Sequence, residues 1–161
     1  MSDTVYNKTK LEHLTDYIVS HLNSSVLDNK IEAWQERAAI VVDGEDRGNG
    51  GHIAAYWRYE AVVSIEEFPH RQLDPRNLFA LVACWLSDHD TERDVHGLDD
   101  PEISVDVISH EAADVLIEIE MMEAIEMIPD EQGLITWRGT KYRVQAVPIN
   151  TAEEYELTNE S

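Results

Sequence analysis

Apolar and polar residues alternate along residues 113–127, and this period of two predicts a strand rather than a helix. The apolar positions expected on one buried face are Val115, Ile117, Ile119, Met121, Ile125 and Met127. The carboxylates of the opposite face are Asp114, Glu118, Glu120 and Glu126. Fifteen extended residues reach about 50 Å, well beyond a strand of ordinary length. We therefore expect the stretch to bend, or to extend past its own domain toward a neighbour.

Two segments repeat apolar residues at helical spacing. Residues 10–23 follow Thr9, which forms a capping box with Glu12, and their apolar stripe consists of Leu11, Leu14, Ile18 and Leu22. Residues 75–88 follow Asp74, a good N-cap residue, and begin with Pro75, which suits a first helical turn. The apolar stripe of this second segment consists of Leu78, Leu81, Val82, Trp85 and Leu86. Both segments are predicted to be amphipathic helices that cover a sheet.

A second long strand is predicted over residues 53–65, where apolar residues again alternate with polar ones. The segment before it is ambiguous, because Ile31, Trp34 and Ala38 fit a helix whereas the β-branched run that follows favours a strand. We favour a strand over residues 38–43. The glycine-rich residues 44–51 then turn the chain, so that the two strands form a hairpin.

The remaining chain is predicted as a charged loop, several strands and an acidic tail. Residues 88–101 are expected to form the loop, and residues 151–161 are expected to fray. The further strands are residues 103–108, 134–137 and 142–147, with a turn at residues 138–141. The element order lacks regular strand–helix alternation, so we predict a single α+β domain over residues 1–150: a mixed, mainly antiparallel sheet packed by two amphipathic helices. The other face of that sheet is expected to be wet, or buried against another subunit.

Charge narrows the possible partners. The chain of 161 residues has a formal net charge of −21, which argues against a surface that binds nucleic acid or an anionic membrane. The carboxylates are compatible with plain solubility, with a conduit that repels DNA, with a DNA mimic or with a surface for basic partners. The single cysteine, the absence of a signal-like amino end and the lack of a long apolar run lead us to expect a cytoplasmic origin and no membrane span.

No pattern for catalysis, a cofactor or a metal emerges. The glycines at positions 48, 50 and 51 lack the lysine and the following helix of a phosphate-binding loop. The candidate metal ligands without a recognised spacing are Asp88, His89, Asp90, His96, Asp99 and Asp100, and we interpret them as a solvated acidic loop. His110 and Glu111 fit a turn between strands. Cys84 is expected to be a small buried side chain rather than a nucleophile.

Aromatic residues gather in the strand of residues 53–65. Tyr56, Trp57 and Tyr59 alternate around Arg58, which places aromatic rings on both faces. A base-stacking platform would also need a basic groove, and this acidic chain offers none in its sequence. One face is therefore interpreted as core and the other as a candidate interface.

Taken in order, four features resemble the phage tail completion protein R family. They are the aromatic strand from Trp57 with Phe68, the helix that contains the Trp85-Leu86 pair, the strand of residues 103–108, and the alternating strand with Asp114 and Glu123. The resemblance spans roughly residues 11–147. It implies the terminator of a contractile phage tail: a small subunit that forms a hexameric ring on the finished tail, stops polymerisation of tail tube and sheath, and offers a surface to the neck of the head. It implies no catalysis and no cofactor.

A ring built from heterologous contacts suits an over-long strand, because an open strand edge can pair with another copy. Residues near 53–59 or 121–127 are therefore expected to cross the subunit interface, and the candidates are Tyr56, Arg58, Met121, Met122, Glu123 and Met127. Candidates for a lumen that repels the phosphates of passing DNA are Glu118, Glu120 and Glu126. The rival hypotheses are an acidic DNA mimic that inhibits a DNA-binding enzyme, and a small hydrolase.

Overall fold

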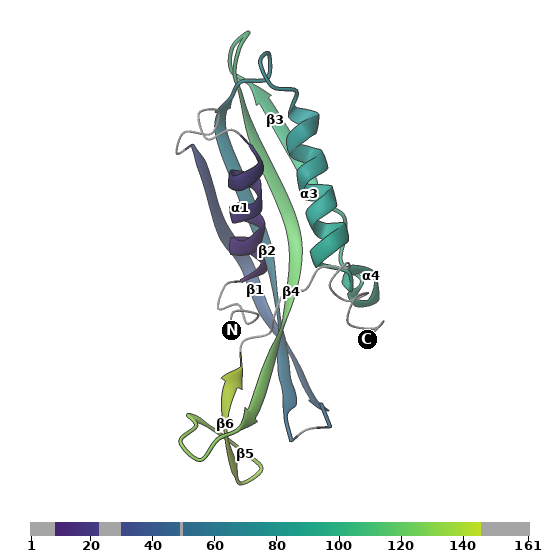
Figure 1. Cartoon of the computed structure of the whole chain (residues 1–161), viewed down its shortest axis with the longest axis vertical. Coiled ribbons are helices and arrows are strands. Elements are labelled where there is room, and N and C mark those ends of the chain that lie inside the picture. The colour runs from purple at the N-terminus through teal and green to yellow at the C-terminus, as the bar shows by residue number, and fades with distance from the viewer. Residues whose placement is uncertain (1–8, 23–29, 49, 146–161) are drawn as a thin grey trace.

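The structure is a computed structural model that describes residues 9–22, 30–48 and 50–145. Within these residues the chain forms three helices and one six-stranded sheet (Figure 1). The helices are α1 (Lys10–His21), α3 (Pro75–His89) and α4 (Arg93–His96). The strands are β1 (Ile31–Asp46), β2 (His52–Phe68), β3 (Glu102–Val107), β4 (Ala113–Pro129), β5 (Ile135–Trp137) and β6 (Thr140–Gln145). The α+β prediction is confirmed, with every strand pair antiparallel.

Strand β4 is the central strand of the sheet. One edge pairs with β2 along almost its whole length. The other edge pairs with β3 over residues 113–118 and with β6 over residues 126–129. The strand is as long as its alternation predicts. Two different strands pair with separate parts of its second edge, so both ends of this edge are hydrogen-bonded.

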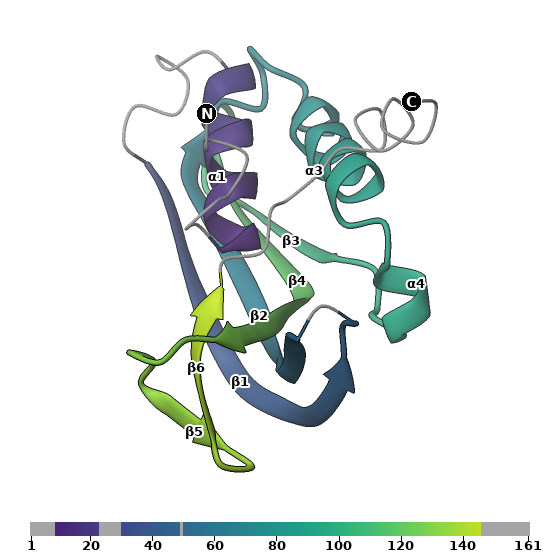
Figure 2. The same ribbon diagram turned by 60° about the horizontal axis from the view of Figure 1, so that its bottom comes forward.

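A strong twist divides the sheet into an upper part and a lower arm (Figure 1). In this view β3 lies to the right of β4 at the top, whereas β6 lies to its left at the bottom. The right-handed twist of long strands accounts for this reversal. The arm therefore projects away from the helices, and its β5–β6 end lies on the opposite side of the molecule from α4, as Figure 2 also shows.

Helices α1 and α3 pack side by side on one face of the upper sheet (Figure 2). The Thr9–Glu12 capping box and the Asp74 cap form as predicted, and the buried residues of both helices come from the predicted stripes. The sheet contributes alternate residues of β2 and β4 to the same core, including Tyr59, Ile117 and Met121. Trp85 is fully buried between the helices and donates a 2.8 Å hydrogen bond to His13.

Two sequence predictions about elements are wrong in extent. The first strand begins at Ile31 rather than near residue 38, because pairing with β2 imposes a strand on residues whose spacing also fits a helix. A bulge at Arg37, with φ of 52°, shifts the phase of the strand midway and obscures its period. The segment predicted as a loop over residues 88–101 contains the short helix α4, which Gly97 ends in a left-handed conformation.

The remaining boundaries differ by a few residues. The predicted hairpin of β1 and β2 is confirmed. The turn predicted over residues 138–141 is shorter than expected, because Thr140 and Lys141 pair with β5 and belong to β6. The predicted tail at residues 151–161 and the last two residues of the strand predicted over 142–147 lie outside the described residues. Ile125, expected in the core, is half-buried. None of the helices in the described ranges is long and apolar enough to cross a membrane.

Candidate assembly surfaces

An ionic cluster of Lys10, Asp90 and Arg93 covers the part of the β4 edge that lies between β3 and β6 and binds its carbonyl groups. The carbonyl of Glu120 accepts a hydrogen bond from Arg93 at 2.7 Å, and the carbonyl of Met122 accepts one from Lys10 at 2.8 Å. Both cations also pair with Asp90, whose side chain is only 2% exposed. The cluster satisfies backbone groups that would otherwise be open to strand addition. This stretch of β4 is therefore occupied within the subunit.

Glu123 holds the start of α1 against the sheet. Its carboxylate accepts a hydrogen bond from the backbone N–H of Lys10 at 2.9 Å and another from the hydroxyl of Tyr59. A carboxylate at a helix N-terminus is favoured by the helix dipole. Burial first, and then the charge of Glu123, raise the pKa of the Tyr59 hydroxyl well above its ordinary value. Tyr59 therefore stays a neutral donor over the whole physiological range.

Asp114, at the start of β4, also accepts a hydrogen bond from a backbone N–H. It accepts a 2.9 Å hydrogen bond from the N–H of Glu67, a residue with φ of 54° where β2 bulges before Phe68. A left-handed conformation is costly for a glutamate, so the contact stabilises a strained turn of the strand. Asp114 and Glu123 thus both fix local backbone geometry.

The six interface candidates fall into two groups. Met121, Met122 and Met127 are buried inside the subunit, and Glu123 is engaged with α1. Tyr56 and Arg58 lie on the face of the sheet away from α1 and α3, where the ring of Tyr56 lies 5.2 Å from that of His96. The second group is open to a partner, whereas the first is already packed. The assignment of these residues to an interface stays a prediction.

The three lumen candidates are unequally paired. Glu120 accepts hydrogen bonds from the backbone of Asp99 and from Arg58, and the Asp99 contact is the main cause that lowers its pKa. Glu126 lies 3.3 Å from Arg47. Glu118 is half-buried, between Val62 and Glu102 on the neighbouring strands. The negative charge of these three carboxylates is therefore partly neutralised by Arg47 and Arg58.

A groove that sequence reasoning missed lies between α3, α4 and β3. Its volume is about 620 Å³. Its apolar lining comes from Phe79, Val82, Leu86, Leu98, Pro101 and Ile103. Asp94 and Asp100 also line it, and both are exposed. The sequence signal was weak, because the groove joins α3, α4 and β3, and α4 lies in the segment that the sequence predicts as a loop.

The β5–β6 hairpin at the end of the arm forms a second unassigned surface. Its inner side is anchored by aromatic rings: Trp137 lies 4.7 Å from His52 and 5.9 Å from the buried Tyr142. Gly133 is required before β5, because a Cβ there would lie 2.1 Å from the carbonyl oxygen of Tyr142. Leu134, which follows it, is 95% exposed. Aromatic packing therefore holds the hairpin in place, and its start carries an exposed apolar side chain.

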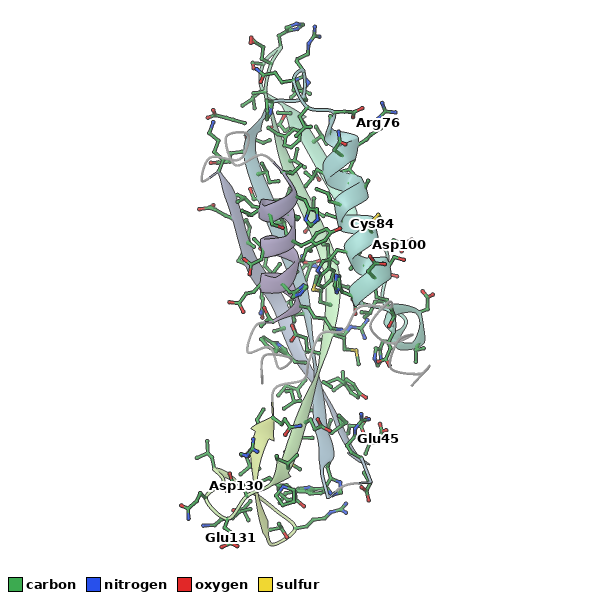
Figure 3. The ribbon with its side chains drawn as sticks, viewed as in Figure 1. Glu45, Arg76, Cys84, Asp100, Asp130 and Glu131 are labelled. Atoms are coloured by element: carbon green, nitrogen blue, oxygen red, sulfur yellow. The ribbon has the colours of Figure 1, made fainter. Side chains whose placement is uncertain are left out.

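The residues considered for chemistry are dispersed. Among the described side chains, no group of three or more His, Cys, Asp or Glu residues is placed to hold a metal ion. Cys84 is exposed, so the prediction that it is buried is wrong: it lies off the apolar stripe of α3 and points away from the sheet (Figure 3). His110 and Glu111 lie exposed in the turn between β3 and β4, as predicted.

Comparison with known proteins supplies a family. The sequence model described as P2 phage tail completion protein R (GpR) matches residues 8–146. A curated relative from Haemophilus phage HP1 (strain HP1c1), described as an uncharacterized 19.2 kDa protein in the rep-hol intergenic region, is 26% identical over 152 residues. That alignment covers 93% of this chain and 90% of the relative. No solved structure matches the chain.

Proposed function

Because this chain belongs to the P2 phage tail completion protein R family, we propose that it caps the finished phage tail as a ring and provides the surface to which the neck of the head attaches. Membership of the family makes the chain a structural component of the phage tail, and the family match covers most of its length. The cap would stop further addition of tail tube and tail sheath subunits. The proposal assigns the chain no catalytic step, no cofactor and no membrane contact.

The observation that best supports a ring is that the two sides of the subunit are unlike. One side of the upper sheet ends in β1 and the other in β3, and among the described residues neither outer edge pairs with a further strand. These two strands run in opposite directions, because three antiparallel pairings separate them. Unlike sides favour head-to-tail contacts, and such contacts close into a ring when the rotation between copies is a simple fraction of a turn. We propose six copies, the number that the family resemblance implies.

The carboxylates of the open sheet face would suit a channel for DNA. Phage DNA must pass through a completed tail, and negative charge along the wall prevents its phosphates from binding. Glu118 and the partly paired Glu120 and Glu126 are the proposed lumen residues. A structure of the assembled ring with these residues on its outer wall would contradict this placement and leave the capping role intact.

Mass in solution separates the ring from the DNA-mimic alternative. Sedimentation of the purified chain should reveal a species near six times the 18.4 kDa of one copy, or the same species once tail tube is added. A monomer or dimer that competes with DNA for a basic enzyme would instead support the mimic. The same samples should protect the end of a tail tube from further growth, which a mimic has no reason to do.

A further inference from the structure

We propose that the β5–β6 hairpin of one copy docks into the groove between α3, α4 and β3 of the next copy. The inference rests on the proposed ring and identifies the surfaces that hold it together. The occupant of the groove is thus a second copy of this chain. Charge, shape and position within the fold each support the pairing.

The hairpin is the basic part of a strongly acidic chain. Residues 134–145 contain Arg138, Lys141 and Arg143 and no acidic residue, although the whole chain has 12 basic and 33 acidic residues. Arg143 lies 3.3 Å from Asp130, while the guanidinium of Arg138 stacks on Trp137 at 4.3 Å. Lys141 is exposed on β6. These cations and the exposed Leu134 give the hairpin a basic and apolar surface.

The groove has the complementary character. Residues 88–102 contain seven acidic residues and a single basic one, Arg93. Asp90 pairs inside the subunit with both Lys10 and Arg93, so the other carboxylates of this segment determine the charge of the rim. Asp94 and Asp100 line the groove above an apolar floor that includes Leu86 and Ile103. An apolar pocket with an acidic rim suits an exposed leucine on a hairpin that carries cations.

The two surfaces lie on opposite sides of the molecule. In both views the hairpin is on the left at the bottom of the molecule, and α3 and α4 are on the right (Figures 1 and 2). Asp100, on the groove side, and Asp130, at the base of the hairpin, are correspondingly far apart in Figure 3. A hairpin therefore meets the groove of another copy, and the contact is heterologous.

Direct pairing between the free edges of β1 and β3 is the rival contact between copies. The pairing register places Trp34 of β1 and Glu102 of β3 in one row across the sheet, so their side chains point to the same face. Side chains two residues apart on a strand also share a face, so this face carries Glu32 and Glu36 on β1 and Glu102 and Asp106 on β3. Joining the edges would bring these carboxylates together, and like charges across strands are destabilising. The hairpin and the groove instead bring opposite charges together.

Charge reversal with mixing tests the inference. The hairpin variant is Arg138→Glu/Lys141→Glu, and the groove variant is Asp94→Lys/Asp100→Lys. In the hairpin variant an acidic hairpin meets an acidic groove, and in the groove variant a basic hairpin meets a basic groove. Each variant alone should therefore lose the ring in sedimentation and fail to restore infectious yield to a phage that lacks this gene. An equimolar mixture should recover both readouts, because each hairpin then finds a groove of opposite charge in an alternating ring.

Matched controls change the same charge at the top of the molecule. They are Lys30→Glu/Arg71→Glu and Asp106→Lys/Glu111→Lys, all at positions away from the hairpin and the groove. Both should keep the ring. Circular dichroism of every variant should match the unmodified chain, which separates loss of assembly from loss of folding.

The outcomes distinguish this inference from the function on which it rests. If both variants assemble and complete tails as the unmodified chain does, the docking inference is wrong and the capping role stands. If each variant is folded and fails alone, and the mixture also fails, the two surfaces do not contact each other. If the unmodified chain neither forms a ring nor restores tails, the proposed function itself is wrong.

Discussion

Asp90 accepts a hydrogen bond of 2.7 Å from Lys10, and this contact ties the end of α3 to the start of α1 across 80 positions of sequence. Arg93 approaches the same carboxylate at 3.0 Å, so one acidic side chain fixes two cations. Each cation in turn binds a carbonyl of β4. The shared carboxylate explains how the subunit satisfies the middle of the β4 edge from within.

Replacement of Asp90 should therefore destabilise the whole subunit. Asp90→Asn keeps the size of the side chain but leaves Lys10 and Arg93 without their counter-charge, and removal of one partner from a buried pair costs about 3 kcal/mol. Urea unfolding at pH 7 measures this change. Asp88→Asn, on the exposed side of α3, is the control and should stay within about 0.5 kcal/mol. Equal stability of the two variants would show that the cluster contributes nothing.

Tyr59 should make the subunit sensitive to alkali. The tyrosine of the unfolded chain loses its proton near the reference pKa of 10.0, whereas the raised pKa keeps folded Tyr59 protonated. A raised folded pKa means that the stabilisation is complete below pH 10 and is lost as the pH rises above it. Above pH 10 the free energy of unfolding should therefore fall less steeply with pH in Tyr59→Phe than in the unmodified chain, and the two slopes should differ by at most about 1.4 kcal/mol per pH unit.

The measurement is the free energy of unfolding of both proteins between pH 8 and about pH 11. At pH 8 tyrosine is protonated in the folded and in the unfolded state, so any difference there reports the lost contacts of the hydroxyl, which donates to Glu123 and accepts from the backbone N–H of Leu11. Parallel curves for Tyr59→Phe and the unmodified chain above pH 10 would contradict the assignment.

Gly133 should be needed for the shape of the hairpin. Gly133→Ala places a Cβ against the backbone of Tyr142, so the start of β5 must move and β6 should lose protection in hydrogen exchange. Gly139→Asn is the matched control, since asparagine tolerates the φ of 81° found there. Unchanged protection of β6 in Gly133→Ala would show that the loop adapts without cost.

Met121 and Tyr56 should separate packing from assembly. Met121→Ala removes a fully buried side chain and should cost about 3 kcal/mol, with the ring retained below the unfolding temperature. Tyr56→Asp changes a half-buried ring on the open face and should weaken the ring with a smaller loss of stability. Calorimetry and sedimentation of the same samples give both quantities. A ring that survives Tyr56→Asp would remove this tyrosine from the interface.

Local chemistry made much of the fold predictable. The capping box at Thr9, the Asp74–Pro75 start of α3 and the alternation in β4 each encode an element within a few neighbouring residues. The full extent of β1 was not encoded in this way, since its first half has helical spacing and becomes a strand by pairing with β2. Tertiary pairing overrides local preference there.

The candidate assembly surfaces were less predictable because they combine distant segments. The groove needs α3, α4 and β3 together, and the carboxylate of Asp90 joins elements that no local pattern relates. One signal was present: Glu123 interrupts an otherwise apolar row between Met121 and Ile125. An acidic residue at such a position needs a donor, and Tyr59 on the neighbouring strand supplies it.

Electron microscopy of tails made with and without this chain tests the capping role most directly. We expect tails of uniform length with a ring of this chain at the head-proximal end when it is present. When it is absent, tube and sheath should extend beyond that length and heads should remain unattached. Tails of normal length that join heads without this chain would contradict the account.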